Sequence, residues 1–181
     1  MGKNDPMTTD VDPEVEAAIA AIYADRDRDH MAPTIEKFES LLAADPENAR
    51  LIYEVGGAYD TAGDEERALP YYERALAGGL GGAARMRCLL QYGSTLRNLE
   101  RHAESVAVLE RAVDEFPEST PLRIWLALSL HAAGRSDRAV ADLMEVAAAA
   151  ITDPTLDRYR PAVAGNAEYL RGLDSARSVQ S

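Results

Sequence analysis

The stretch GAYDTAGDEERALPYYERAL, residues 57–76, has the pattern of two helices joined by a tight turn. Gly63 stands at the expected turn, because glycine readily adopts the positive φ that ends a first helix. Tyr59 before the turn, and Tyr72 and Ala75 after it, lie at the helical spacing of a buried stripe. The stretch therefore predicts a helical hairpin.

The same hairpin pattern recurs along the chain. Four units begin near Val15, Ala49, Met86 and Thr120, which are 34, 37 and 34 residues apart. A fixed period in this range is typical of repeat architectures, in which each unit buries its apolar face against the next. The irregular spacing comes from three extra residues at the glycine cluster 78–82, which we interpret as a flexible linker between repeats. It lacks the Lys-Ser/Thr pair of a phosphate-binding loop.

Equivalent positions of the units carry residues of the same kind. Numbering each unit from its first residue, small side chains stand at position 8 on the first helices, where they allow a partner helix to approach: Gly56, Gly93 and Ala127. Position 15, at the turn, holds Gly63, Glu100 and Gly134. Proline at position 32, in Pro46 and Pro117, ends the second helix of its unit.

These positions resemble the tetratricopeptide repeat, over residues 15 to about 151. The resemblance is strongest in residues 57–76 and in LSLHAAGRSDRAVADL, residues 128–143. RMRCLLQYGSTLRNL, residues 85–99, also resembles a subgroup of short bacterial tetratricopeptide proteins. The first unit departs from the pattern, with Ile22 at position 8, and we interpret it as a degenerate repeat that caps the array.

The repeat pattern and the resemblance together predict an all-α protein. We expect a right-handed α-solenoid of about four helix-turn-helix units, followed by a C-terminal capping helix. A single domain is expected over residues 12–173, between disordered ends at 1–11 and 174–181. Its units are expected near 15–48, 49–85, 86–119 and 120–153, with the capping helix at about 155–172. First helices are expected near 13–25, 49–62, 84–98 and 120–133, and second helices near 33–44, 66–77, 103–115 and 136–150.

The composition of the chain argues against several classes of function. The formal net charge of -12 argues against a nucleic-acid-binding protein, which must neutralise phosphates, and against binding to anionic membranes. The sequence has no apolar run long enough to span a bilayer and no signal-peptide core. Its single cysteine, Cys88, cannot form an internal disulfide, so we expect a cytoplasmic protein. The resemblance to short bacterial tetratricopeptide proteins implies a bacterial one.

Reactive groups do not cluster in the sequence. The three histidines, His30, His102 and His131, lie in three different units, and none forms the paired motif of a zinc protease helix. Cys88 lies on a predicted helix and is interpreted as a small buried hydrophobe. We therefore predict no catalytic residue, no metal ion and no cofactor, and a protein that is not an enzyme.

The resemblance implies where a partner would bind. In tetratricopeptide proteins the side chains of the binding groove come mostly from positions 2, 5, 9, 12 and 13 of the first helices. Transferred to this sequence, these positions give twenty residues in four units, and we predict that twelve of them form the partner-binding groove. They are Tyr23, Arg26, Arg50, Tyr53, Arg87, Leu90, Ser94, Arg97, Asn98, Ile124, Leu128 and His131.

The arginines of this groove indicate the kind of partner. They stand out in a chain whose acids outnumber its bases by 12, so we expect a protein or peptide partner that is acidic or ends in a carboxylate. The competing interpretation is that several of these arginines pair with carboxylates on the adjacent first helix. The clamp that binds chaperone tails in some relatives is not expected, because it needs Lys at position 5 and Asn at position 9, where the first unit has Ile19 and Tyr23.

The sequence thus predicts a protein–protein interaction scaffold that binds a peptide or protein segment in the groove. A second hypothesis is a self-assembling, homodimeric structural protein. Short arrays leave terminal faces that dimerise readily, and the only tryptophan, Trp125, could belong to such a contact.

Overall fold

The computed structural model describes residues 12–178 of the 181-residue chain. All regular secondary structure in that range is helical, as the sequence predicts. The chain divides into two compact units, Met1–Leu99 and Glu100–Ser181, which we call unit 1 and unit 2 and describe separately.

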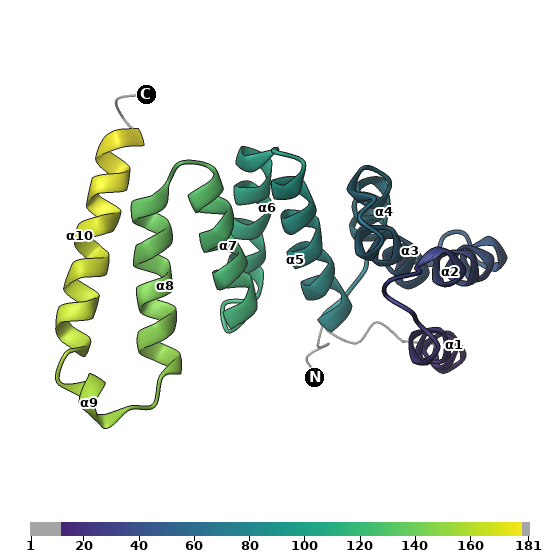
Figure 1. The fold of residues 1–181 in the computed structure, drawn as a ribbon, viewed down its shortest axis with the longest axis horizontal. Helices are drawn as coiled ribbons and strands as arrows, with labels where there is room; N and C mark the ends of the chain where they lie inside the picture. Colours follow the sequence, from purple (N-terminus) through teal and green to yellow (C-terminus); the bar gives the residue numbers. More distant parts are fainter. Residues whose placement is uncertain (1–11, 179–181) are drawn as a thin grey trace, which may run out of the picture. The chain divides into compact units, whose positions relative to one another are not determined.

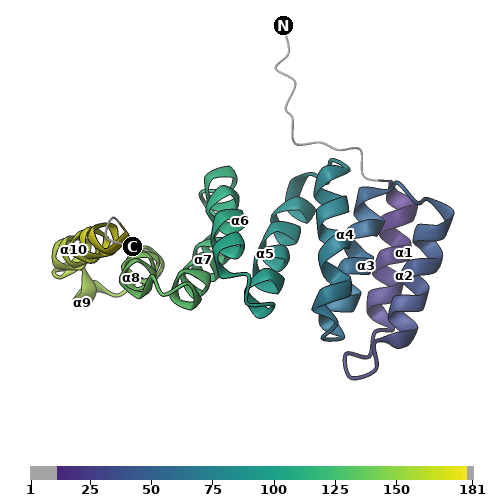
Figure 2. The same ribbon diagram turned by 90° about the horizontal axis from the view of Figure 1, so that it is seen from above.

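Unit 1 is built from two helical hairpins and one further helix. Each helix packs on the next one along the chain, and α3 also contacts α5. Helices α2, α4 and α5 therefore all contact α3. Figures 1 and 2 both show α1 to α4 side by side. The helices are α1 (Pro13–Ala24), α2 (Ala32–Ala44), α3 (Ala49–Thr61), α4 (Glu65–Ala77) and α5 (Gly82–Asn98).

Unit 2 contains the rest of the array. Helix α7 packs on α6 and α8, and α8 packs on the last helix, α10, as both ribbon views show. The helices are α6 (His102–Glu115), α7 (Thr120–Ala132), α8 (Ser136–Ala150), α9 (Pro154–Asp157) and α10 (Arg160–Ser178). The first eight helices begin and end within two residues of the bounds that the sequence predicts. The division between the units falls inside the third predicted repeat, because α5 packs on α3 and α4 whereas α6 packs on α7.

The hairpin of α3 and α4 depends on a close approach at Gly56. A Cβ atom at this position would lie 3.0 Å from Tyr71 Cβ and 3.1 Å from Tyr72 Cδ1. The Tyr72 ring is fully buried in the core. The absence of a side chain at Gly56 therefore lets a large ring fill the space between the two helices, as predicted for position 8.

The turns between paired helices use positive φ, as predicted. Gly63 has φ of 77° and Gly134 has φ of 79°. The amide of the residue after each glycine donates a hydrogen bond to the last turn of the preceding helix. Asp64 N donates to Tyr59 O at 3.0 Å, and Arg135 N donates to Leu130 O at 2.8 Å. Glu100 occupies the same position between α5 and α6, and its φ of 60° is the one positive value of a non-glycine residue in the described range.

The glycine cluster 78–82 differs from the flexible linker that we expected. Gly79 has φ of 84°, and the Leu80 amide donates to Ala75 O at 3.1 Å, which forms an ordered C-terminal cap on α4. The Leu80 side chain is buried in the core of unit 1. The three extra residues thus form a capped turn that is anchored by an apolar side chain.

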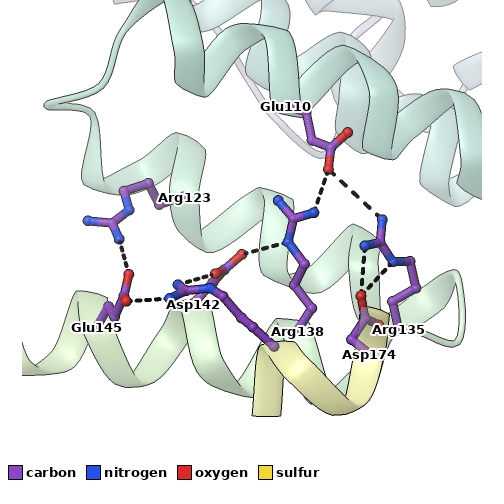
Figure 3. Close-up of polar contacts among 8 residues, drawn as sticks. Glu110, Arg123, Arg135, Arg138, Asp142, Glu145 and Asp174 are labelled. Carbon is purple, nitrogen blue, oxygen red and sulfur yellow. Dashed lines mark hydrogen bonds and ion pairs between the residues drawn. The ribbon is translucent and has the colours of Figure 1, made fainter. Parts of the chain in front are cut away.

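The C-terminal helix is longer than predicted. Residues 174–178 were expected to be disordered, but α10 continues through them to Ser178. Charged contacts hold this end of α10: Asp174 is buried and accepts from Nη2 of Arg135, the residue before α8, at 2.7 Å (Figure 3). Arg171 pairs with Asp142 on α8 at 2.7 Å. The predictions for residues 1–11 and 179–181 lie outside the described residues.

Glu100 offers a direct test of the turn geometry. Left-handed backbone costs an L-residue about 1–2 kcal/mol, which glycine avoids at a smaller entropic cost. We therefore expect Glu100→Gly to raise the free energy of unfolding by up to about 1 kcal/mol in urea denaturation followed by circular dichroism. The matched control is Gly134→Ala, which should lower it by about 1 kcal/mol through backbone strain alone, since a Cβ there meets nothing within 4 Å. A loss of stability in Glu100→Gly would contradict this account.

Candidate protein-binding surface

The predicted groove residues fall into both units. Unit 1 holds nine of them, on or just after the first helices α1, α3 and α5, and we call this surface the first-helix face. Its members are Tyr23, Arg26, Arg50, Tyr53, Arg87, Leu90, Ser94, Arg97 and Asn98. The other three, Ile124, Leu128 and His131, lie on α7 in unit 2.

Arg50 is held by two carboxylates. Its Nε donates to Glu16 Oε1 at 2.6 Å, and its Nη1 forms an ion pair with Glu54 one turn further along α3. The Glu54 side chain is only 2% exposed, and it also accepts a hydrogen bond from the Tyr23 hydroxyl. Arg50 therefore links α1 to α3 and compensates a buried negative charge. It is a structural residue.

Tyr23 and Arg26 form the α1 side of the face. The Tyr23 ring packs edge-on against the buried Phe38, with ring centroids 5.5 Å apart, while 38% of the residue remains exposed. The Arg26 guanidinium lies over this ring, 4.8 Å from its centroid, which is a favourable cation–π distance. Burial raises the pKa of the Tyr23 phenol. Within residues 12–178, Arg26 makes no ion pair.

Tyr53 and Arg87 form the centre of the face. Tyr53 is 5% exposed, and the Arg50 guanidinium lies 5.6 Å from its ring centroid. Burial raises the pKa of the Tyr53 phenol, and the positive charge of the Arg87 guanidinium opposes this shift. Arg87 itself is exposed and pairs with no carboxylate of the described chain. Unlike Arg50, it retains an uncompensated charge.

The far end of α5 carries a second arginine without an acidic partner. Arg97 Nη2 donates to Ser94 Oγ at 3.1 Å and lies 3.5 Å from Asn98 Oδ1. Its Nη1 is buried and has no hydrogen-bond partner among the described residues, and burial lowers the pKa of this guanidinium. Leu90, one to two turns before Ser94 and Arg97, is half-buried.

Asp60 and Thr95 fix the position of α5 on α3. Thr95 Oγ1 donates to Asp60 Oδ1 at 3.1 Å, and the Tyr72 hydroxyl donates to Asp60 Oδ2 at the same distance. Burial is the main reason that the pKa of Asp60 is raised, although both hydroxyls oppose the shift. This acid is therefore satisfied by neutral donors and leaves the arginines of the face unpaired.

The unit 2 residues form a different kind of surface. Leu128 is 43% exposed and Ile124 is half-buried, so they present apolar area on α7. His131 Nδ1 lies 3.0 Å from Ser136 Oγ at the turn into α8. Within unit 1, contacts join Tyr23 to Arg26 and Arg50 to Tyr53. Arg97 contacts Ser94 and Asn98 at the end of α5. That the predicted residues form one groove stays a prediction.

Groups that could carry out chemistry are not assembled in the described residues. Cys88 is fully buried, and burial raises the pKa of its thiol to about 12, so it is not a reactive thiolate. His30 is exposed and pairs with Asp27 at 3.2 Å. Residues 12–178 contain no group of three His, Cys, Asp or Glu side chains placed to hold a metal ion. No helix in that range is both long and apolar enough to cross a bilayer.

Comparison with known proteins identifies the family. The family model described as "Tetratrico peptide repeat" matches residues 49–170, which is more than half of the chain. The chain belongs to the tetratricopeptide repeat family. No curated protein sequence matches it.

Solved structures of tetratricopeptide repeat proteins have the same fold at low sequence identity. MamA residues 41 to the end, from Desulfovibrio magneticus RS-1, is 15% identical, with a TM-score of 0.63 over 94% of this chain and 99% of that one. A MamA crystal structure is 17% identical, with a TM-score of 0.62 over 74% and 71%. YrrB, described as a TPR protein with an unusual peptide-binding site, is 18% identical, with a TM-score of 0.57 over 91% and 75%.

Glu54 is a residue of this tetratricopeptide repeat face that the family positions did not predict. Position 6 was not among those transferred from the family, yet its carboxylate connects Arg50 and Tyr23. One signal was available: Arg50 and Glu54 are four residues apart, a spacing at which opposite charges pair on a helix. For Arg50 the competing interpretation of pairing across adjacent first helices is correct, as its contact with Glu16 shows. For Arg26, Arg87 and Arg97 no such pair exists among the described residues.

The different roles of Arg50 and Arg87 can be distinguished by measuring the free energy of unfolding of variants. Arg50→Ala leaves the Glu54 carboxylate buried without its partner, which should lower the free energy of unfolding by about 3–5 kcal/mol. Replacing both members, as Arg50→Met with Glu54→Leu, should recover most of this loss. Arg87→Ala is the matched control and should change it by less than about 0.5 kcal/mol. Equal effects of Arg50→Ala and Arg87→Ala in urea denaturation would refute the distinction.

Proposed function

We propose that this tetratricopeptide repeat protein is a non-catalytic interaction scaffold whose first-helix face binds a segment of another protein. The observation that carries the proposal is that some arginines of this face pair with carboxylates and others do not. Arg50 is neutralised by Glu16 and Glu54, whereas Arg26, Arg87 and Arg97 pair with no carboxylate of the described chain. In a chain with a net charge of -12, three uncompensated cations on one face favour an acidic or carboxylate-ended partner.

The other features of the face agree with a recognition surface. Tyr23 offers a partly exposed ring beside a guanidinium, and tyrosine and arginine are enriched at the energetic centres of interfaces. YrrB, a structural neighbour, is described as having a peptide-binding site, which supports peptide binding as the mode of action. The single cysteine and the acidic composition favour the cytoplasm as the compartment.

The proposal is tested by selecting twelve-residue peptides from a random displayed library on the immobilised wild-type chain. We expect the selected peptides to lose binding to Arg87→Glu combined with Arg97→Glu, because both changes replace an unpaired cation with an anion. Helical content should stay unchanged, since neither arginine compensates a described carboxylate. Fluorescence anisotropy measures the binding and circular dichroism measures the helicity.

The matched control is Arg67→Glu combined with Arg74→Glu. These arginines lie on α4 in the same unit, so the control changes the net charge equally but leaves the first-helix face intact. Peptide binding should survive in this variant. Failure to select any peptide, or equal loss in both double variants, would remove the first-helix face as the binding site.

Self-assembly is a second candidate function, favoured by apolar side chains exposed in unit 2. Tyr169 on α10 is 65% exposed, and Val140 and Leu143 on α8 are 48% and 39% exposed. Gly165 and Gly172 flank Tyr169 on α10 and leave open space beside it. If this surface is a contact between two copies, light scattering should give twice the 19.6 kDa chain mass and Tyr169→Glu should return it to the monomer value. A monomer mass at every concentration would exclude this function.

A further inference from the structure

The fourth repeat, formed by α7 and α8, is packed differently from the three before it. At position 24 of their second helices the first three repeats have Phe38, Tyr72 and Leu109, which are at most 1% exposed. The equivalent Leu143 on α8 is 39% exposed, and Val140, one turn earlier on the same side, is 48% exposed. We call this side the α8 open face. Its members are Val140, Leu143 and Ala147.

The α8 open face is uncovered because α10 packs on a different side of α8. Two acids of α8, Asp137 and Glu145, form ion pairs with arginines of α10. Ala141 lies one turn from each of these acids on the same stripe of the helix, and it is fully buried. Ala141 occupies position 22, which is exposed in the first three repeats. Both ribbon views show α8 between α7 and α10 (Figures 1 and 2).

In the earlier repeats the first helix of the next repeat covers this side. Tyr59 of α3 donates to Glu39 of α2 at 2.6 Å, and Tyr92 of α5 donates to Glu73 of α4 at 3.0 Å. Both glutamates are at position 25, directly after the buried position 24. The repeats themselves therefore show that a first helix fits the surface that stays open on α8.

Helix α1 presents the matching uncovered surface. A first helix contacts the preceding second helix through positions 3, 7 and 10. In later repeats these positions hold Cys88, Tyr92 and Ser129, which hydrogen-bond to that helix. In α1 the same three positions hold exposed alanines, which we call the α1 open face. Its members are Ala17, Ala21 and Ala24.

Neither open face carries a formal charge, although 28% of the residues of the chain are charged. Position 25 is glutamate in the first three repeats but Met144 in the fourth. Position 7, which is Tyr92 in the third repeat, is Ala21 in the first. The polar contact that joins inner repeats is thus replaced by apolar side chains on both faces. Two chains with a net charge of -12 repel each other, so contact is favoured where neither face is charged.

We propose that the α1 open face of a second copy packs on the α8 open face, as the first helix of a following repeat does within the array. Val140 and Leu143 lie against the alanines of the partner copy, so that large side chains meet small ones and the two helices approach closely. The contact rests on the proposed self-assembly function and specifies it. Because it joins two different surfaces, each added copy still offers one open face, and the assembly can grow beyond a dimer.

Two variants that each block one face test the contact by complementation. Ala21→Glu blocks the α1 open face, and Val140→Glu blocks the α8 open face, because each buries an unpaired charge in the contact. Each variant alone should give the monomer mass of 19.6 kDa in light scattering. An equimolar mixture should give twice this mass, since the intact α8 of one variant binds the intact α1 of the other. Circular dichroism should show unchanged helicity, because both positions are exposed.

The wild-type chain should form assemblies whose mass rises with concentration. It should do so at lower concentration in about 0.5 M salt than in about 0.05 M salt, because screening weakens the repulsion between the acidic chains. The matched control is Ala107→Glu, which adds the same charge at the exposed position 22 of α6, away from both open faces. This variant should associate like the wild-type chain.

The outcomes separate this contact from self-assembly in general. A wild-type chain that associates while the two blocked variants fail to complement would overturn the contact, and so would wild-type association by either variant alone. If Tyr169→Glu then abolished association, self-assembly through α10 would stand in its place. A monomer mass at every concentration and salt would overturn both. The scaffold function is tested separately, since neither variant changes an arginine of the first-helix face.

Discussion

The close approach of two helices at Gly56 is the contact on which unit 1 depends. Because position 8 of the hairpin lacks a side chain, the Tyr72 ring fits against the α3 backbone and is completely buried. The Tyr72 hydroxyl then reaches Asp60, which in turn accepts from Thr95 and fixes α5. One missing side chain thus determines the spacing of α3 and α4 and, through a buried acid, the position of the next first helix.

The electrostatics of the first-helix face follow from this arrangement. Once α1 and α3 are packed in register, Glu16 and the buried Glu54 both reach Arg50, and their two negative charges more than offset its single positive charge. Asp60 is satisfied by two hydroxyl groups. Asp25 and Asp27, which flank Arg26 in the sequence, pair with Lys37 and His30. Arg26 and Arg87 form no ion pair among the described residues.

Much of this could be predicted from the sequence, because local signals carried it. Gly63 and Gly134 mark turns that require positive φ, and the helix bounds follow from spacing and capping residues. What the sequence did not predict depends on contacts distant along the chain. Asp174 near the end of α10 pairs with Arg135, 39 residues earlier, and Arg50 is paired with Glu16 from the preceding repeat. Such pairings depend on helix register, which residue spacing within one helix does not determine.

The ion pairs between α8 and α10 make the end of the array respond to acidity. Arg171 donates to Glu145 and Asp142, and this contact holds the pKa of Glu145 below its usual range. A carboxylate with a lowered pKa stabilises the folded state at neutral pH and loses that contribution as the pH falls through its folded value. Acidification would therefore weaken the attachment of the terminal helix to α8.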